Sequence, residues 1–167
     1  MLPLGPVGLA NSPYMSLSAF AGNPSLIDLH ELVHYGWLTQ NELDDTQCKS
    51  PNRLNYLEVM SFRINMLKKA SERLFKQGNL ESQNQYKEFY LSEKAWLDDY
   101  ALFQALNHKY DSEEWTTWDH DITIRDSNAL KKASEELREH VEFHKFTQWC
   151  FNRQWNKWMR LLTERES

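Results

Sequence analysis

Apolar residues recur at three- and four-residue steps along most of the chain from residue 57 onward, which is the spacing of one helix face. The first run predicts a helix over residues 57–78, because Gly78 is a residue type that commonly ends helices. Its apolar face is formed by Leu57, Met60, Ile64, Leu67 and Leu74. A second helix is predicted over residues 81–109, and its apolar side is formed by Tyr86, Phe89, Tyr90, Leu97, Tyr100 and Phe103.

The C-terminal part continues the helical pattern after a predicted loop over residues 111–126, which carries two tryptophans. One long helix is predicted over residues 127–164, with Asp126 or Ser127 as its N-cap. Its stripe is formed by Leu130, Leu137, Val141, His144, Gln148, Phe151, Trp155, Trp158 and Leu162. A coiled coil would fit this spacing, but a helix packed within a helical subdomain is the preferred interpretation.

The first 25 residues follow neither a helical nor a strand period. Prolines that fix φ and glycines that permit turns interrupt them: Pro3, Gly5, Pro6, Gly8, Pro13 and Gly22. Ordered segments of this kind line a site or form a long surface loop, and the residues alone leave both readings open. Pro24 then begins a short amphipathic helix that ends near Gly36, and residues 37–52 read as a polar connection. The only strand-like stretch is Leu2–Leu4.

Composition narrows the class of protein. A length of 167 residues with 41% hydrophobic and 26% charged residues is typical of one globular domain. The net charge of −5 argues against a nucleic-acid partner. No apolar run approaches the roughly 20 residues that span a bilayer, and residues 1–10 make a poor signal peptide. Cys48 and Cys150 read as free thiols in a reducing compartment. We therefore expect a cytoplasmic protein without a membrane partner, or a plastidial one in a plant-like cell.

His30-Glu31-Leu32-Val33-His34 matches the zinc motif H-E-x-x-H, in which two imidazoles share one helix face and the glutamate activates a water. The extended form of the motif fails here, and nothing marks a third ligand, although Glu58 is a candidate. Surface histidines are the preferred interpretation, and no metal or other cofactor is expected.

Two other polar groups invite a structural reading. Asp98 and Asp99 are adjacent on a predicted helix, so their side chains point about 100° apart and do not converge on one substrate bond. A cap or a pair with a base such as Lys94 is the preferred role. His144 and Gln148 interrupt an apolar stripe, and a buried hydrogen-bonded pair that orients the helix is preferred to a ligand role.

Several segments resemble one enzyme family in the family's own order. They are Leu2-Pro-Leu-Gly-Pro6, Ser12-Pro-Tyr14, Ser16-Leu-Ser-Ala-Phe-Ala-Gly-Asn-Pro24, Leu26-Ile-Asp-Leu29, Trp96-Leu-Asp-Asp-Tyr-Ala-Leu-Phe103, Glu142-Phe-His-Lys-Phe-Thr-Gln-Trp149 and Phe151-Asn-Arg-Gln-Trp155. In these residues the chain resembles the 4-alpha-glucanotransferases, also called amylomaltases or disproportionating enzymes.

The resemblance implies an α/β TIM barrel with helical insertions and a retaining transfer of α-1,4-glucan segments to the 4-hydroxyl of another sugar. It places the catalytic Asp, Glu and Asp on later barrel strands, which no segment of this sequence matches. A full barrel needs about 250 residues. We therefore expect an internal fragment, mostly α-helical, that is inactive alone and has no catalytic residue of its own.

The resemblance also suggests substrate-binding residues and a division of the chain. Ser12 and Tyr14 fall where the family lines its donor-sugar subsites, while Tyr14 packing within the loop remains an alternative. Leu9 stands where some members carry a tyrosine of a secondary glucan site, and Met15 stands where Gln is common.

Three regions are expected. Residues 1–36 form a barrel strand end, a substrate loop and a short helix; residues 37–126 form an inserted helical subdomain; and residues 127–167 form a long helix leading to the next strand. The alternative function is a stand-alone helical binding module or an H-E-x-x-H zinc protein.

Overall fold

The computed structural model describes residues 4–6, 16, 18–44, 56–111 and 114–165, and all regular structure in these ranges is helical. The elements are η2 (Pro24–Leu26), α1 (Leu29–His34), α2 (Gln40–Asp44), α3 (Tyr56–Gln77), α4 (Leu80–Lys109), η3 (Trp115–Thr117), α5 (His120–Thr123), α6 (Ser127–Glu136) and α7 (Arg138–Arg165). The mostly helical character is therefore confirmed. Leu4 lies outside any strand, and the rest of the strand-like stretch Leu2–Leu4 lies outside the described residues. No helix in these ranges is long and apolar enough to cross a membrane.

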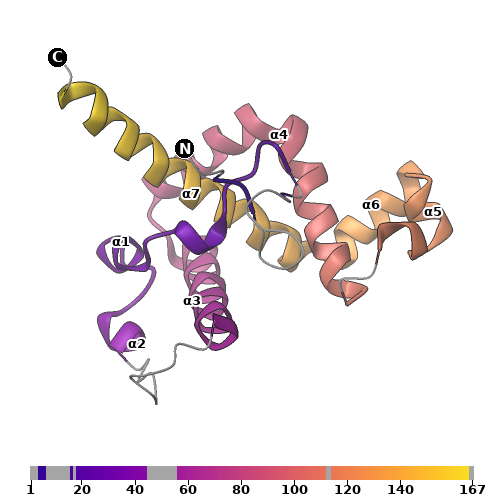
Figure 1. The fold of residues 1–167 in the computed structure, drawn as a ribbon, viewed down its shortest axis with the longest axis horizontal. Coiled ribbons are helices and arrows are strands. Elements are labelled where there is room, and N and C mark those ends of the chain that lie inside the picture. The colour runs from indigo at the N-terminus through magenta and orange to yellow at the C-terminus, as the bar shows by residue number, and fades with distance from the viewer. Residues whose placement is uncertain (1–3, 7–15, 17, 45–55, 112–113, 166–167) are drawn as a thin grey trace.

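The helices α4 and α7 form the centre of the molecule (Figure 1). Helices α1, α2 and α3 lie toward one end of the molecule, and α5 and α6 extend at the other (Figure 1). The main core lies where α1 and α3 meet α7. Its fully buried members include Leu32, Leu67, Leu74, Phe146 and Cys150. Removing this many apolar side chains from water is the main favourable contribution to folding.

The predictions of a polar connection and of a loop were only partly right, and residues 45–52 and 112–113 of these regions lie outside the described residues. The connection predicted over residues 37–52 contains α2, and the loop predicted over residues 111–126 contains η3 and α5. Trp37 and Leu38, which open that connection, are buried in the main core. The helices in these regions have only 3 to 5 residues, so the helical period does not show in the sequence. Packing and local caps determine where such short helices form.

The single C-terminal helix predicted over residues 127–164 is two helices, α6 and α7, that meet at Leu137. Leu137 has φ −101° and ψ 20°, outside the α-helical values. Its side chain packs against two separate apolar clusters, one around Ala105 and Val141 and the other around Trp118 and Ala133. The break lets successive helices bury apolar residues in both clusters. The predicted N-cap is confirmed, because Asp126 accepts from the amides of Asn128 and Ala129.

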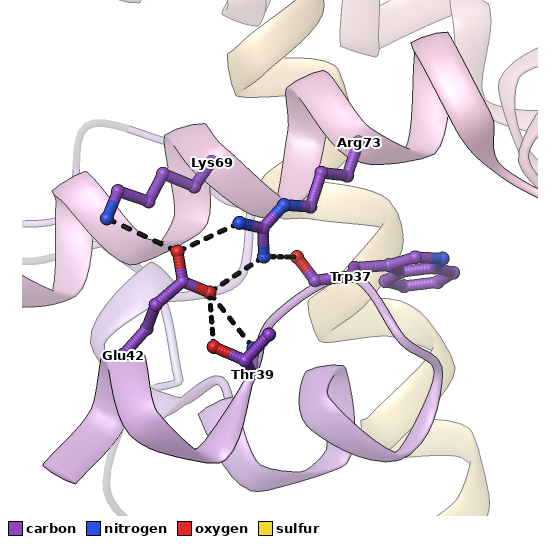
Figure 2. Close-up of polar contacts among 5 residues, drawn as sticks. All are labelled: Trp37, Thr39, Glu42, Lys69 and Arg73. Atoms are coloured by element: carbon purple, nitrogen blue, oxygen red, sulfur yellow. Dashed lines mark hydrogen bonds and ion pairs between the residues drawn. The ribbon is translucent and has the colours of Figure 1, made fainter.

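A polar network fastens α2 to α3 (Figure 2). Glu42 accepts from the backbone amide of Thr39 at 3.0 Å, as the glutamate of a capping box does. The same carboxylate accepts two hydrogen bonds from Arg73, at 2.7 and 2.9 Å, and Lys69 lies 3.4 Å away. Arg73 also donates to the carbonyl of Trp37 at 3.1 Å. The Arg73 guanidinium is the main reason why the pKa of Glu42 falls from 4.5 to about 2.

We expect Glu42→Gln to destabilise the chain by about 1 kcal/mol at pH 7, because a partly exposed ion pair with a cap contributes about that much. A lowered pKa stabilises the folded state above the unfolded value of 4.5, and this contribution is lost as pH falls toward about 2. The difference in unfolding free energy between wild type and E42Q should therefore shrink between pH 5 and pH 2. Urea titrations across this range measure it, with the exposed Glu72→Gln as control. A difference that stays constant with pH would contradict the assignment.

Candidate functional site

The described part of the N-terminal segment, with α4 and α7, lines an open cavity of about 490 Å³. One wall is formed by residues 18–22 of the segment. The opposite walls carry Phe89 and Trp96 from α4, and Gln148, Phe151 and Trp155 from α7. Among the described residues this lining contains no carboxylate, imidazole, amine or thiol. The described lining therefore presents aromatic rings, amides and hydroxyls.

Gln148 holds the N-terminal segment against α7. The amide of Gly22 donates to Oε1 of Gln148 at 2.8 Å, and Nε2 of Gln148 donates to the Gly22 carbonyl at 3.0 Å. Gln148 is 2% exposed, so both bonds form away from water. The backbone amide of the next residue, Asn23, donates to the carbonyl of Leu4 at 2.8 Å. The described ends of the segment that contains residues 7–15 are thus held together.

The chain runs beside α7 from Gly22 to Glu31 in a fixed register. Gln154 forms the same pair of bonds with the backbone of Asp28, at 2.8 and 3.0 Å. Lys157 donates to Glu31 at 3.1 Å. The contacts of Gly22, Asp28 and Glu31 all join residues 126 positions apart, so the two segments run in the same direction. The register fixes how the N-terminal segment meets the cavity.

The N-terminal segment approaches α7 so closely at position 22 that only glycine fits there. A Cβ atom placed on Gly22 would overlap the ring of Phe151. That ring is stacked on Trp155 with centroids 6.3 Å apart and planes 7° apart, so it has a neighbour that limits its movement. The absence of a side chain at residue 22 thus allows the backbone to reach Gln148.

Aromatic rings give the cavity its second chemical feature. Phe20 is 73% exposed and stacks on Trp96, with centroids 6.0 Å apart. Exposed ring faces can pack against the CH groups of a sugar ring, while the amide of Asn152 in the same lining can bond to hydroxyls. Sequence reasoning assigned no binding role to Phe20, Trp96 or Asn152. All three stand in segments that carried the family resemblance, which was the available signal.

The predicted substrate residues Ser12 and Tyr14 lie outside the described residues, as do Leu9 and Met15. The first described hydroxyls after them organise the segment locally. Ser16 donates to the carbonyl of Ser18 at 2.7 Å. Oγ of Ser18 accepts from the amides of Phe20 and Ala21 at 3.2 and 3.1 Å.

The structure favours structural roles for the H-E-x-x-H residues. The His30 side chain is 74% exposed and lies 3.5 Å from Asp28. Glu31 accepts from the hydroxyl of Tyr35 at 3.0 Å and from Lys157, so its carboxylate joins α1 to α7. No group of three metal-ligating side chains occurs within the part of the chain that the structure describes. These contacts do not favour the zinc alternative.

Asp98 and Asp99 diverge, as their adjacent positions predict. Asp98 lies 2.6 Å from Lys145 of α7, and Asp99 receives two hydrogen bonds from Arg125, at 2.8 and 2.9 Å. The predicted structural role is confirmed, but these bases replace the expected Lys94. Residues distant in sequence supply the partners, so local spacing could not identify them.

The predicted pair of His144 and Gln148 is only partly confirmed. His144 is largely buried and Gln148 is fully buried. The side-chain amide of Gln148, however, bonds to the backbone of Gly22 and not to His144. Burial is the main cause that lowers the pKa of His144 to about 3, so its imidazole is neutral near pH 7. Cys150 is a buried free thiol whose pKa is raised by burial, and Cys48 lies outside the described residues.

Comparisons with known proteins agree with one another. Residues 1–166 match the family profile described as 4-alpha-glucanotransferase. The chain is 39% identical over 155 residues to the 4-alpha-glucanotransferase of Thermus thermophilus, covering 93% of this chain and 30% of that protein. It is 36% identical over 157 residues to that of Synechocystis sp., covering 94% and 31%. The chain therefore spans about a third of the length of these relatives.

A solved structure extends the likeness to three dimensions. The amylomaltase from Streptococcus agalactiae in complex with acarbose superposes with a TM-score of 0.81 at 29% identity. The superposition covers 93% of this chain and 31% of the amylomaltase. Sequence and fold agree over nearly all of the chain, so it belongs to the 4-alpha-glucanotransferase family.

Proposed function

We propose that this chain is part of a 4-alpha-glucanotransferase that moves α-1,4-glucan segments to the 4-hydroxyl of an acceptor glucan or glucose. The reaction would be a retaining double displacement that serves starch, glycogen or maltodextrin metabolism without a cofactor. The match over residues 1–166 carries this proposal. The acarbose complex of the similar amylomaltase supports a saccharide as the ligand class.

Within such an enzyme, the chain would bind substrate and supply no catalytic group. The cavity beside α4 and α7 supports this role, because its described lining combines aromatic rings and amides without an ionisable group. We assign Ser12 and Tyr14 to the same substrate-binding segment, whose C-terminal end is held by Gln148 at Gly22. The proposed architecture is a TIM barrel in which residues 1–36 and 127–167 flank an inserted subdomain of residues 37–126.

Glucan binding by the segment can be measured by titrating the chain with maltotriose. Tyr14→Ala should weaken binding about tenfold, because an aromatic platform contributes about 1.4 kcal/mol or more to a stacked ligand. Tyr14→Phe keeps the ring face and removes only the hydroxyl, so it separates stacking from hydrogen bonding. Unchanged affinity in both variants would show that Tyr14 only packs within its own segment.

Transferase activity should be absent from the 167-residue chain, because the segments that match the family do not include its Asp, Glu and Asp. Incubation with maltotriose should release no glucose above the level of a blank. Glucose release that scales with chain concentration and persists through purification would overturn the proposal that the chain lacks catalytic residues.

A further inference from the structure

A second cavity, of about 630 Å³, lies between α1, the N-terminal half of α4 and the C-terminal half of α7. Its size is in the range of pockets that enclose small ligands. Glu31 and Tyr35 line it from the α1 side, Gln85 from α4, and Asn156 and Lys157 from α7. Phe89 and Asn152 also line the first cavity, whereas the five residues named above line only the second.

The charges around the second cavity are balanced. Its lining carries the acidic side chains of Glu31, Glu88 and Glu164 and the basic side chains of Arg153, Lys157 and Arg160. Glu31 and Lys157 are paired at 3.1 Å. An anion such as a phosphate ester needs a net positive site, so balanced charges favour a neutral ligand.

Amide side chains supply donors and acceptors on two walls of the second cavity. On α7, Asn156 donates to Asn152 at 2.9 Å, and both line the cavity. Gln85 lines the cavity from α4 and donates to Glu81 at 3.2 Å. Each amide has capacity for further hydrogen bonds beyond these. Such groups match a ligand rich in hydroxyls.

Arg153 forms part of the second cavity's wall. Its guanidinium carbon lies 3.8 Å from the centroid of the Tyr35 ring. Within the residues that the structure describes, its buried Nη1 has no hydrogen-bond partner. The guanidinium stacked on Tyr35 therefore closes one side of the cavity.

We propose that this second cavity binds a short neutral α-1,4-glucan. The choice of glucan among neutral saccharides rests on the proposed function, whereas the balanced charge and the amides are features of the cavity itself. The hydroxyls of the glucan would bond to Gln85, Asn152 and Asn156, beside the guanidinium of Arg153.

The test is a maltotriose titration of the 167-residue chain, followed by backbone and side-chain amide NMR. We expect a Kd of about 1 mM, with shifts at Gln85 and Asn156. The double variant Gln85→Ala and Asn156→Ala should weaken this binding at least about tenfold, a loss of about 1.4 kcal/mol. Asn84→Ala, an exposed amide on the same helix outside the lining, should leave it unchanged. Unaltered shifts at Gln85 and Asn156 throughout the titration would overturn the proposal, as would tighter binding of inorganic phosphate than of maltotriose at these residues.

The same titration tests the two proposed sites independently of each other. Shifts confined to residues 18–22, Trp96 and Trp155, which line only the first cavity, would support the proposed function and reject the second cavity as a site. Shifts at Gln85 and Asn156 that persist in Tyr14→Ala would support the second cavity even if the role of Tyr14 fails.

Discussion

Gln148→Leu should destabilise the chain by about 3 kcal/mol, or about 9 °C in Tm, although leucine suits a buried helix position. The substitution leaves the N–H and C=O of Gly22 without their partner in a region where water does not reach Gln148. An unpaired buried backbone group costs about 1–3 kcal/mol, and two are affected here. Chemical denaturation gives the free energy, and hydrogen exchange at the Gly22 amide reports the lost bond directly.

Gln154→Leu is the matched control for this prediction. Gln154 makes the same two bonds to Asp28, but Asp28 is exposed and Gln154 is 8% exposed. Water can replace part of the lost bonding there, so we expect a smaller loss of about 1–2 kcal/mol. Equal effects of the two variants, or unchanged protection of the Gly22 amide in Q148L, would contradict the anchoring role.

Gly22→Ala should cost about 2–3 kcal/mol, because the added Cβ overlaps the Phe151 ring and overpacking of a filled site costs that much. Phe151 could move only by disturbing its stack on Trp155. We also expect weaker maltotriose binding, since Gly22 and Phe151 both line the first cavity. Thermal denaturation and the binding titration measure the two effects.

A double-mutant cycle makes the steric cause testable. In a Phe151→Ala background the overlap is gone, so Gly22→Ala should then be nearly neutral. Gly36→Ala serves as the control glycine. It has φ +75° with open space around its Cβ position, so it should lose only about 1 kcal/mol through backbone strain. The steric explanation fails if Gly22→Ala is equally costly with and without the Phe151 ring.

The helical content and the family were both readable from the chain. Runs such as 57–78 and 81–109 repeat their apolar residues over several turns, and α3 and α4 begin and end within a few residues of those bounds. The local cap at Asp126 was also predictable, since it depends on neighbouring residues only. The first 24 residues carried the longest part of the family resemblance, because their prolines, glycines and hydroxyls form a specific pattern.

Other features needed the folded chain. The break at Leu137 depends on two apolar clusters that local spacing does not reveal. The charged partner of Asp98 is Lys145 of α7, and that of Asp99 is Arg125 in the turn between α5 and α6. The H-E-x-x-H pattern gives no indication that Glu31 pairs with Lys157 of α7.

The sequence by itself determined where helices form and which family the chain belongs to, because helical periodicity, caps and motifs are properties of residues close together in the chain. The tertiary structure decided which polar side chains meet. The amide of Gln148 has the same chemistry on any helix, and only the packing of α7 beside the N-terminal segment gives it the backbone of Gly22 as a partner. That pairing spans 126 positions and depends on burial, which no local pattern encodes.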